Sequence, residues 1–499
     1  MRRRVPLTLL LAPLLVTACT SDPAAPAAGP SAPTTTPSPT APTTTPSPTA
    51  PAVDYTAWQA GRSTPVADTI YPARGTGALD VLHYDLALDW APATKTLAGT
   101  ATLRIRPTKD APSLVLDFMP YQVDGVTLDD ATVTGTVAKE KLTVTAPVVA
   151  DKPVTLVVKY HGTPKTTPMP SHRKDVEDLG LTVTKEGGLW TMQEPFGAFT
   201  WYPANDQPSD EALYDIKVTV PAGWSAIASG TPAGQSGTTF TYRSADPVAS
   251  YLTTLAVGKY QKLTAKGPRG IPLTFWYRKG ADDKLLPYLK KSPQYLAWLE
   301  KKFGPYPFPS GGVVVVDSAS GMETQQMITM GRKIENTKAR RDRWGGDLLH
   351  EYAHQWFGDS VTPTTWTDLW LNEGWAQYAQ DLYTKETLHL SDASLDRYLR
   401  DADAAMRKKL GPPGKPNPKN FAEGNVYLCP EAMLHEIHQQ LGDKAFFALA
   451  RAWVQDQRNT QQNRASFIAF VNKQTGRDFT KLINTWLDSK TTPKPIKAT

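Results

Sequence analysis

The spacing of apolar residues changes once along the chain, near residue 260, and this change limits the possible folds. Before it, apolar and polar residues alternate, as in the run Tyr84, Leu86, Leu88 and Trp90. Such alternation predicts short antiparallel strands with one buried face. Beyond it the spacing becomes helical. We expect helices at 348–357, 370–385, 394–409, 430–441, 443–456, 464–474 and 479–488.

These patterns predict an α+β protein of two folded domains. An all-β domain occupies residues 54–260, and a mostly helical domain with a small sheet at its start occupies residues 261–499. A chain of 499 residues suits this number of domains.

The first 18 residues have the features of a lipoprotein signal peptide. Three arginines precede an apolar run from Val5 to Val16, and small residues lead to Cys19. The stretch "VTAC" resembles a bacterial lipobox, whose cysteine becomes the lipidated first residue of the mature chain. We therefore expect an exported protein held on the cell membrane through Cys19. The alternative is an ordinary secretory signal with a chance cysteine.

Residues 19–53 are dominated by Pro and Thr, and "APTTTPSPT" occurs twice among them. So few apolar side chains cannot form a core, and we expect a disordered tether. Cys429 is the only other cysteine, so a lipidated Cys19 leaves no disulfide within the chain.

The composition argues against some classes of partner. The net charge of +6 includes three signal-peptide arginines, and the other charges are scattered, so nucleic acid is not an expected partner. After the signal peptide no apolar stretch is long enough to span a membrane. We expect a monomer, although the sequence does not define the oligomeric state.

The stretch "LLHEYAHQWFGD" (348–359) carries the clearest chemical signal. His350 and His354 are four residues apart, so on a helix they lie on one face and can share a zinc ion. Glu351 can reach a water molecule beside that ion and act as a general base. The alternative is a solvated helix face, but the neighbouring apolar residues predict burial, where these polar groups need partners.

A third ligand is expected because catalytic zinc takes three protein ligands and keeps one position open. Glu373 in "WLNEGWAQYAQ" follows His354 after 18 intervening residues. That distance fits the end of one helix, a connection and the start of the next. We predict that His350, His354 and Glu373 bind one Zn²⁺ ion.

This spacing resembles that of the aminopeptidase N family of gluzincin zinc metallopeptidases. "EPFGAFTWYPANDQP" (194–208) and "GPYPFPSGGVVVV" (304–316) are also similar to family segments, and the resemblance covers about 75–495. It implies a saddle-like antiparallel β domain followed by a thermolysin-like catalytic domain. It also implies removal of N-terminal residues from peptides.

The resemblance implies roles for individual residues near "SGMET" (320–324). His350, His354 and Glu373 match the zinc ligands, and Glu351 matches the base. Glu323 matches the glutamate that binds the substrate's α-amine, and Gly321 with Met322 matches the edge strand against which the substrate lies. The family usually has Gly-Ala-Met-Glu-Asn here, so Ser320, Gly321 and Thr324 are departures.

Two further segments carry implied roles. Glu194 matches a second carboxylate that the β domain sends into the site, and Met192 and Gln193 are expected to line the pocket for the first side chain. Tyr427 in "NVYLCPEAMLHEI" matches the tyrosine that stabilises the oxyanion. Pro430 suits the first turn of a helix, which would place Tyr427 just ahead of that helix.

Several points stay open from the sequence. The departures at 320–324 leave room for a zinc endopeptidase, or another hydrolase, that does not recognise a free amine. A non-catalytic peptide-binding protein on the same fold is a further alternative. Asp359 and Asp368 are both candidates to hold the zinc-binding imidazoles. The chain has no room for the further helical domain of longer family members, so we expect an open cleft.

Overall fold

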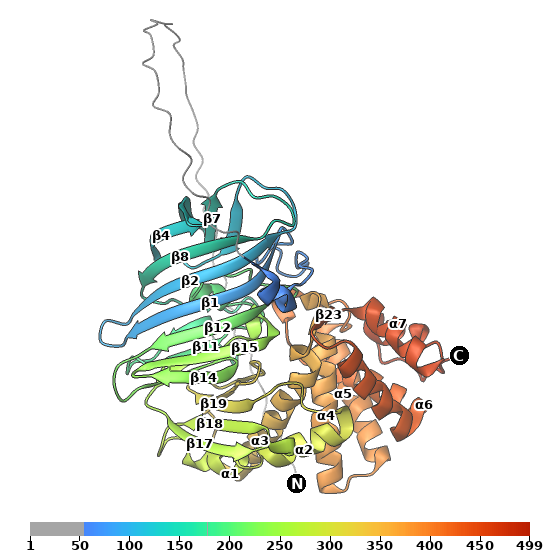
Figure 1. Cartoon of the computed structure of the whole chain (residues 1–499). Coiled ribbons are helices and arrows are strands. Elements are labelled where there is room, and N and C mark those ends of the chain that lie inside the picture. Colours follow the sequence, from blue (N-terminus) through green and yellow to red (C-terminus); the bar gives the residue numbers. More distant parts are fainter. Residues whose placement is uncertain (1–53, 177) are drawn as a thin grey trace, which may run out of the picture. The chain divides into compact units, whose positions relative to one another are not determined.

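The computed structural model describes residues 54–176 and 178–499. The predicted signal peptide (1–18) and tether (19–53) lie outside the described residues. Asp54–Thr499 forms one unit, in which strands occupy the first part and helices the last (Figure 1). The predicted α+β class is confirmed. In the described ranges, no helix has both the length and the apolar character needed to cross a membrane.

An eight-stranded sheet forms the body of the β half, in the order β14-β15-β12-β1-β2-β8-β4-β5. Its centre is β1, which pairs antiparallel with β2 and parallel with β12. The predicted alternation holds there, because Tyr84, Leu86, Leu88 and Trp90 are all buried. The strands are β1 (Leu79–Ala91), β2 (Thr96–Pro107), β4 (Gln122–Leu128), β5 (Ala131–Thr132), β8 (Val154–Gly162), β12 (Glu211–Thr219), β14 (Thr231–Ser236) and β15 (Thr239–Ala249).

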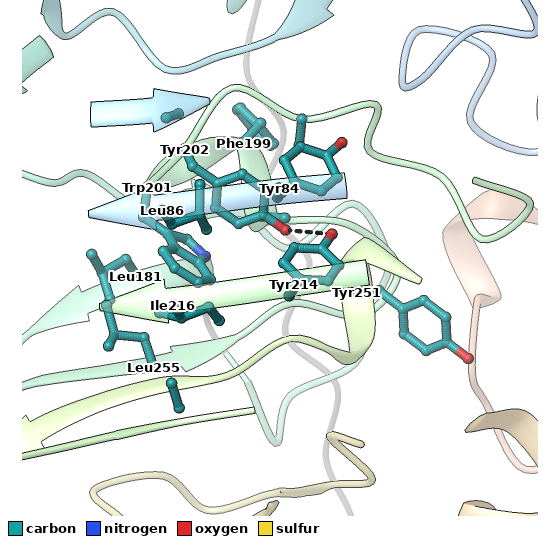
Figure 2. Packing of buried hydrophobic residues seen from close by; sticks show 14 of the residues in the cluster. Tyr84, Leu86, Leu181, Phe199, Trp201, Tyr202, Tyr214, Ile216, Tyr251 and Leu255 are labelled. Carbon is teal, nitrogen blue, oxygen red and sulfur yellow. Dashed lines mark hydrogen bonds between the residues drawn. The ribbon is translucent and has the colours of Figure 1, made fainter. Parts of the chain in front are cut away.

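Two smaller sheets complete the β half. One has the order β3-β7-β6, and the other has the order β13-β16-β11-β10-β9. Figure 2 shows the core that contains residues of both the five-stranded and eight-stranded sheets, where the hydroxyls of Tyr202 and Tyr214 lie 3.2 Å apart. The strands are β3 (Leu114–Asp117), β6 (Thr134–Ala138), β7 (Lys141–Thr145), β9 (Thr167–Pro168), β10 (Asp178–Val183), β11 (Leu189–Met192), β13 (Ser225–Ala228) and β16 (Leu255–Gly258).

The second half begins with a five-stranded sheet in the order β17-β18-β19-β21-β20. Its central strand β19 is fully buried, as expected for the apolar run "GGVVVV". The shortest strand, β20, lies at one edge and pairs only with β21. The strands are β17 (Gln261–Lys266), β18 (Pro272–Tyr277), β19 (Gly311–Val316), β20 (Gly321–Met322) and β21 (Ile328–Gly331).

Helices follow this sheet, and α3, α4 and α6 carry the site. A two-stranded pair of β22 (Val361–Pro363) and β23 (Thr460–Gln462) lies among them. The helices are α1 (Leu286–Leu289), α2 (Ser292–Phe303), α3 (Lys338–His354), α4 (Trp370–Leu388), α5 (Asp392–Leu410), α6 (Asn425–Asp456), α7 (Arg464–Thr475) and α8 (Thr480–Asp488).

Two helices begin five or more residues before the predicted start. Helix α3 begins ten residues before 348, where the Thr337 side chain caps it by accepting a hydrogen bond from the backbone N–H of Arg340. Its first turns are polar, so the spacing of apolar residues did not reveal them. Helix α6 begins at Asn425, so Pro430 lies inside it and not in its first turn. The placement of Tyr427 ahead of this helix is therefore wrong. Gly442, with φ of 72°, interrupts α6 where we expected a break between two helices.

Candidate metal centre and substrate site

Helices α3 and α4 bring three donor atoms together. His350 and His354 project from one face of α3, and Glu373 lies in the first turn of α4. The Nε2 atoms of the two histidines are 3.0 Å apart. Each also lies 3.2 Å from Oε2 of Glu373. The three side chains are buried, with exposed fractions between 1% and 8%.

This triangle fits one zinc ion. Ligand atoms at about 2.0–2.1 Å from a tetrahedral zinc ion stand about 3.3 Å apart, close to the edges observed. Two neutral imidazoles and a carboxylate are also a donor set that zinc prefers. The sequence prediction of the three ligands therefore agrees with their geometry.

His354 is oriented by a backbone carbonyl and not by Asp359 or Asp368, the two carboxylates that we expected. Its Nδ1 donates to the carbonyl oxygen of Phe357 at 3.0 Å, which leaves Nε2 free to face the metal. The helix ends here in a π-helical turn, and Gly358 has φ of 130°. Within the described part of the chain, the buried carboxylate of Asp359 accepts no hydrogen bond, while Asp368 accepts from the indole of Trp370 and the backbone of Arg464. The expectation for both aspartates is wrong.

Glu351 lies beside the metal ligands and beneath the edge strand β20. Its carboxylate belongs to a group with Glu323 and His354 whose ligand atoms all lie within 4.8 Å of one another. A Cβ atom placed on Gly321 would lie 2.6 Å from its Oε1. Burial and the neighbouring Glu323 raise the pKa of Glu351 well above its usual range. A proton acceptor therefore sits between the metal ligands and β20.

Two more carboxylates face the same site from different elements. Glu323 follows β20, and its backbone carbonyl accepts a bond from Gln355 at 2.8 Å. Glu194 follows β11 in the β half. One oxygen of each carboxylate, Oε1, is buried without a hydrogen-bond partner among the described residues. Burial and nearby Glu323 raise the pKa of Glu194. Two buried acceptors that lack partners favour a cationic group between them.

Tyr427 reaches the site from the first turn of α6. Its ring stacks on His350 with 6.0 Å between ring centres and an interplanar angle of 26°. Burial, with Glu373 beside it, raises the pKa of the Tyr427 hydroxyl well above its usual range. A protonated hydroxyl is a hydrogen-bond donor, and this one lies next to a metal ligand.

Gln193 does not reach the site, although its neighbour Met192 does. Adjacent residues of an extended chain point to opposite sides. The Gln193 side chain points into the β half, where Nε2 donates to Ser250 and Thr253 and Oε1 accepts from Trp201. The expectation that Gln193 contacts the substrate is therefore wrong.

Arg173 is a site residue that the sequence did not reveal. It lies between β9 and β10, and its Nη1 donates to Oε2 of Glu194 at 3.1 Å. "SHRKD" reads as a polar loop, and nothing in it distinguishes this arginine from others. Arg173 lies on the β-half side of the site through its contact with Glu194, and the expected open cleft stays a prediction.

Comparison with known proteins places both halves in one family. The Peptidase family M1 domain matches residues 288–486, and the Peptidase M1 N-terminal domain matches residues 81–252. Aminopeptidase N of Streptomyces lividans is 24% identical over 331 residues, covering 62% of this chain and 38% of that protein. Aminopeptidase N of Acetobacter pasteurianus is 26% identical over 301 residues, covering 56% of this chain and 84% of that protein. The matched region thus spans less than half of the Streptomyces protein.

A solved structure agrees with this placement. The M1 zinc metallopeptidase of Deinococcus radiodurans, a mutant bound to a Tyr-Ser-Ala substrate, superposes with a TM-score of 0.76. It is 27% identical, and the superposition covers 86% of this chain and 99% of that one. Together the two domain matches span more than half of the sequence, and the chain belongs to peptidase family M1.

Proposed function

We propose that the protein is a zinc aminopeptidase that removes N-terminal residues from peptides. The observation that carries this proposal is the position of two unpartnered carboxylate oxygens, on Glu323 and Glu194, beside a three-residue zinc site. A free α-ammonium group would satisfy both oxygens, and this would place the first peptide carbonyl near the metal. The family assignment and the substrate-bound Deinococcus relative support the same activity.

The metal site and the base act together on the peptide bond. A zinc ion held by His350, His354 and Glu373 would supply a Lewis acid and lower the pKa of a bound water. Glu351 takes a proton from the attacking water and passes it to the leaving amine. Its place beside the metal ligands suits a group that must both accept and release a proton.

Other residues position the substrate and stabilise developing charge. Tyr427 donates a hydrogen bond to the carbonyl oxygen as that oxygen becomes negative. Strand β20 pairs with β21 along one edge. The peptide extends along its other, free edge at Gly321 and Met322. Glu323 and Glu194 fix the α-ammonium, so cleavage occurs after the first residue.

One experiment tests the proposal against its alternatives. Zinc content and cleavage of free and N-acetylated leucine amides are measured for the wild type, Glu351→Gln and Glu323→Gln. We expect one zinc per chain, preference for the free amine, no turnover in Glu351→Gln, and loss of that preference in Glu323→Gln. Equal cleavage of both substrates indicates an endopeptidase or another hydrolase, and bound zinc without cleavage indicates a peptide-binding protein.

The proposal includes a place of action outside the cytoplasm. The lipobox-like "VTAC" and the basic, apolar leader support export and lipidation of Cys19. More than one acyl chain on that cysteine holds a protein stably on a membrane. The enzyme then acts on peptides at the membrane surface.

A further inference from the structure

The segment Met169–Val176, between β9 and β10, covers the substrate side of the site. Arg173 is its central residue, and the guanidinium is mostly buried, with 14% of the side chain exposed. The Nε and Nη2 atoms donate to the two oxygens of Asp175 at 3.1 and 2.8 Å. Nη1 donates to Oε2 of Glu194 at 3.1 Å. Arg173 therefore occupies three carboxylate oxygens at once.

Ser320 fixes this arrangement to the edge strand. Its hydroxyl donates to Oδ2 of Asp175 at 2.6 Å and lies 3.5 Å from Nη2 of Arg173. Hydrogen bonds from Arg173 and Ser320 outweigh burial and lower the pKa of Asp175 to about 2. Ser320 is one of the departures from the usual family sequence, and the network gives it a structural role.

A small pocket lies beside this network, and Arg173 and Glu194 form part of its wall. As it stands it is small, with room for about one water molecule, but three of its walls are flexible methionine side chains that can move to admit a substrate side chain. Its apolar walls are Met169, Val176, Met192 and Met322, and its charged groups are Arg173 and Glu194.

The position of the pocket identifies the side chain that would enter it. Glu194 lines the pocket and would hold the α-ammonium, while Gly321 lines it and lies against Glu351. In a peptide the first Cα atom lies between the α-nitrogen and the first carbonyl carbon. The first side chain projects from that atom and so points into this pocket.

A cationic side chain would meet the positive charge of Arg173 there, and Arg173 already pairs with the carboxylates of Asp175 and Glu194. Asp175 is engaged by Arg173 and Ser320, and Oε2 of Glu194 is engaged by Arg173. The remaining oxygen, Oε1, faces the α-ammonium in the proposed function. A buried cation without a partner is costly, whereas an uncharged apolar side chain gains from the methionine walls.

We propose that Arg173 is a specificity-determining residue that excludes N-terminal lysine and arginine and admits uncharged apolar residues. This inference rests on the proposed aminopeptidase function. Removing Arg173 frees carboxylate oxygens on Asp175 and Glu194 and opens space beside them. A substrate's own guanidinium or ammonium group can then take the vacant place.

The test compares kcat/KM for the p-nitroanilides of leucine and arginine. We expect the wild type to prefer leucine by about tenfold or more, and Arg173→Ala to reduce that ratio at least tenfold by gaining on the arginine substrate. Arg173→Lys keeps a cation in place and should keep the leucine preference. Arg62→Ala removes an exposed arginine that pairs with Asp151 and contacts no residue of the pocket, and it serves as the matched control.

Each outcome separates the inference from the function on which it rests. Cleavage of neither substrate by the wild type contradicts the aminopeptidase proposal itself. Cleavage of leucine with an unchanged ratio in Arg173→Ala overturns the role of Arg173, as does a wild type that prefers arginine. If Arg173→Ala does not fold, which thermal unfolding shows, Arg173→Met retains the apolar stem and must give the same shift.

Discussion

Gly321 lies where the edge strand β20 passes beside the Glu351 carboxylate. A Cβ atom there would be 2.6 Å from Oε1 of Glu351 and 3.1 Å from the sulfur of Met330. The carboxylate tip is flexible and can move, so we expect Gly321→Ala to cost little stability. Because the moved group is the proposed base, kcat should fall about 10-fold or more while KM changes less. Steady-state kinetics and thermal unfolding measure the two effects.

The family usually has alanine at the position of Gly321, so the test asks whether the Glu351 carboxylate of this chain can accommodate that methyl group without loss of kcat. Gly125→Ala is the control, because a Cβ atom there would meet nothing within 4 Å. An unchanged kcat in Gly321→Ala would show that a methyl group at this position does not displace Glu351, and would contradict the prediction.

Gly358 holds the turn that presents the Phe357 carbonyl to His354. Its φ of 130° is disfavoured for other residues, and a Cβ atom would lie 3.3 Å from Nδ1 of His354. We expect Gly358→Ala to weaken zinc binding about 10- to 100-fold, because the imidazole loses its fixed orientation. Titration against a chelator of known affinity measures this change.

Gly280→Ala separates metal binding from backbone strain. Gly280 also has a positive φ, of 83°, but a Cβ atom there meets nothing within 4 Å. Both variants should lose some stability, and only Gly358→Ala should lose zinc affinity. Equal zinc affinity in the two variants would contradict the positioning role of this turn.

At the scale of elements, Glu211 joins the β half to the helical half. This residue of β12 accepts a hydrogen bond from Thr362 of β22 at 2.5 Å and another from Gln461 of β23. Burial is the main cause that raises the pKa of Glu211 from 4.5 to about 7. The folded state thus favours the protonated carboxyl, and stability is lost as pH rises from about 4.5 through 7.

Glu211→Gln should remove this loss. The shift of about 2.5 pH units corresponds to about 3 kcal/mol of unfolding free energy. Between pH 5 and pH 8 the wild type loses about 2.5 kcal/mol of this, and we expect that part of the pH dependence to disappear in the variant, as measured by urea denaturation. Glu335→Gln changes an exposed carboxylate and should behave as the wild type. A variant with the wild-type pH dependence would show that Glu211 is ionised in the folded protein.

The elements also show what the sequence could and could not predict. The strands of β1 and β2 and the metal-binding helices were predictable, because their apolar spacing and motifs are local. The start of α3 was not, since its first turns are polar and exposed, and neither was the continuation of α6 through Pro430. Pro430 packs against Gly374 of α4, where a Cβ atom would lie 2.7 Å from it, so a contact between helices overrides the local signal.

At the scale of the whole molecule, the site combines residues that are distant in sequence. The zinc ligands were found from fixed spacing, but Arg173, Ser320 and the Phe357 carbonyl become meaningful only through contacts that folding creates. The same reason explains the error for Gln193, whose partners Ser250 and Thr253 are more than 50 residues away. Spacing motifs identify the metal centre, whereas groups that orient the substrate depend on how the halves pack.

The proposed membrane anchor and the site lie in different parts of the sequence. The site residues all lie within Asp54–Thr499, whereas the proposed anchor is Cys19. We therefore expect Cys19→Ser to abolish labelling by a radioactive fatty acid and to move the protein from the membrane fraction to the soluble fraction. Peptide cleavage per molecule should remain unchanged. Cys429→Ala is the matched control, because Cys429 is buried in α6 and its removal should leave both labelling and location as in the wild type. Membrane association that persists in Cys19→Ser would show that another feature of the chain holds the protein there.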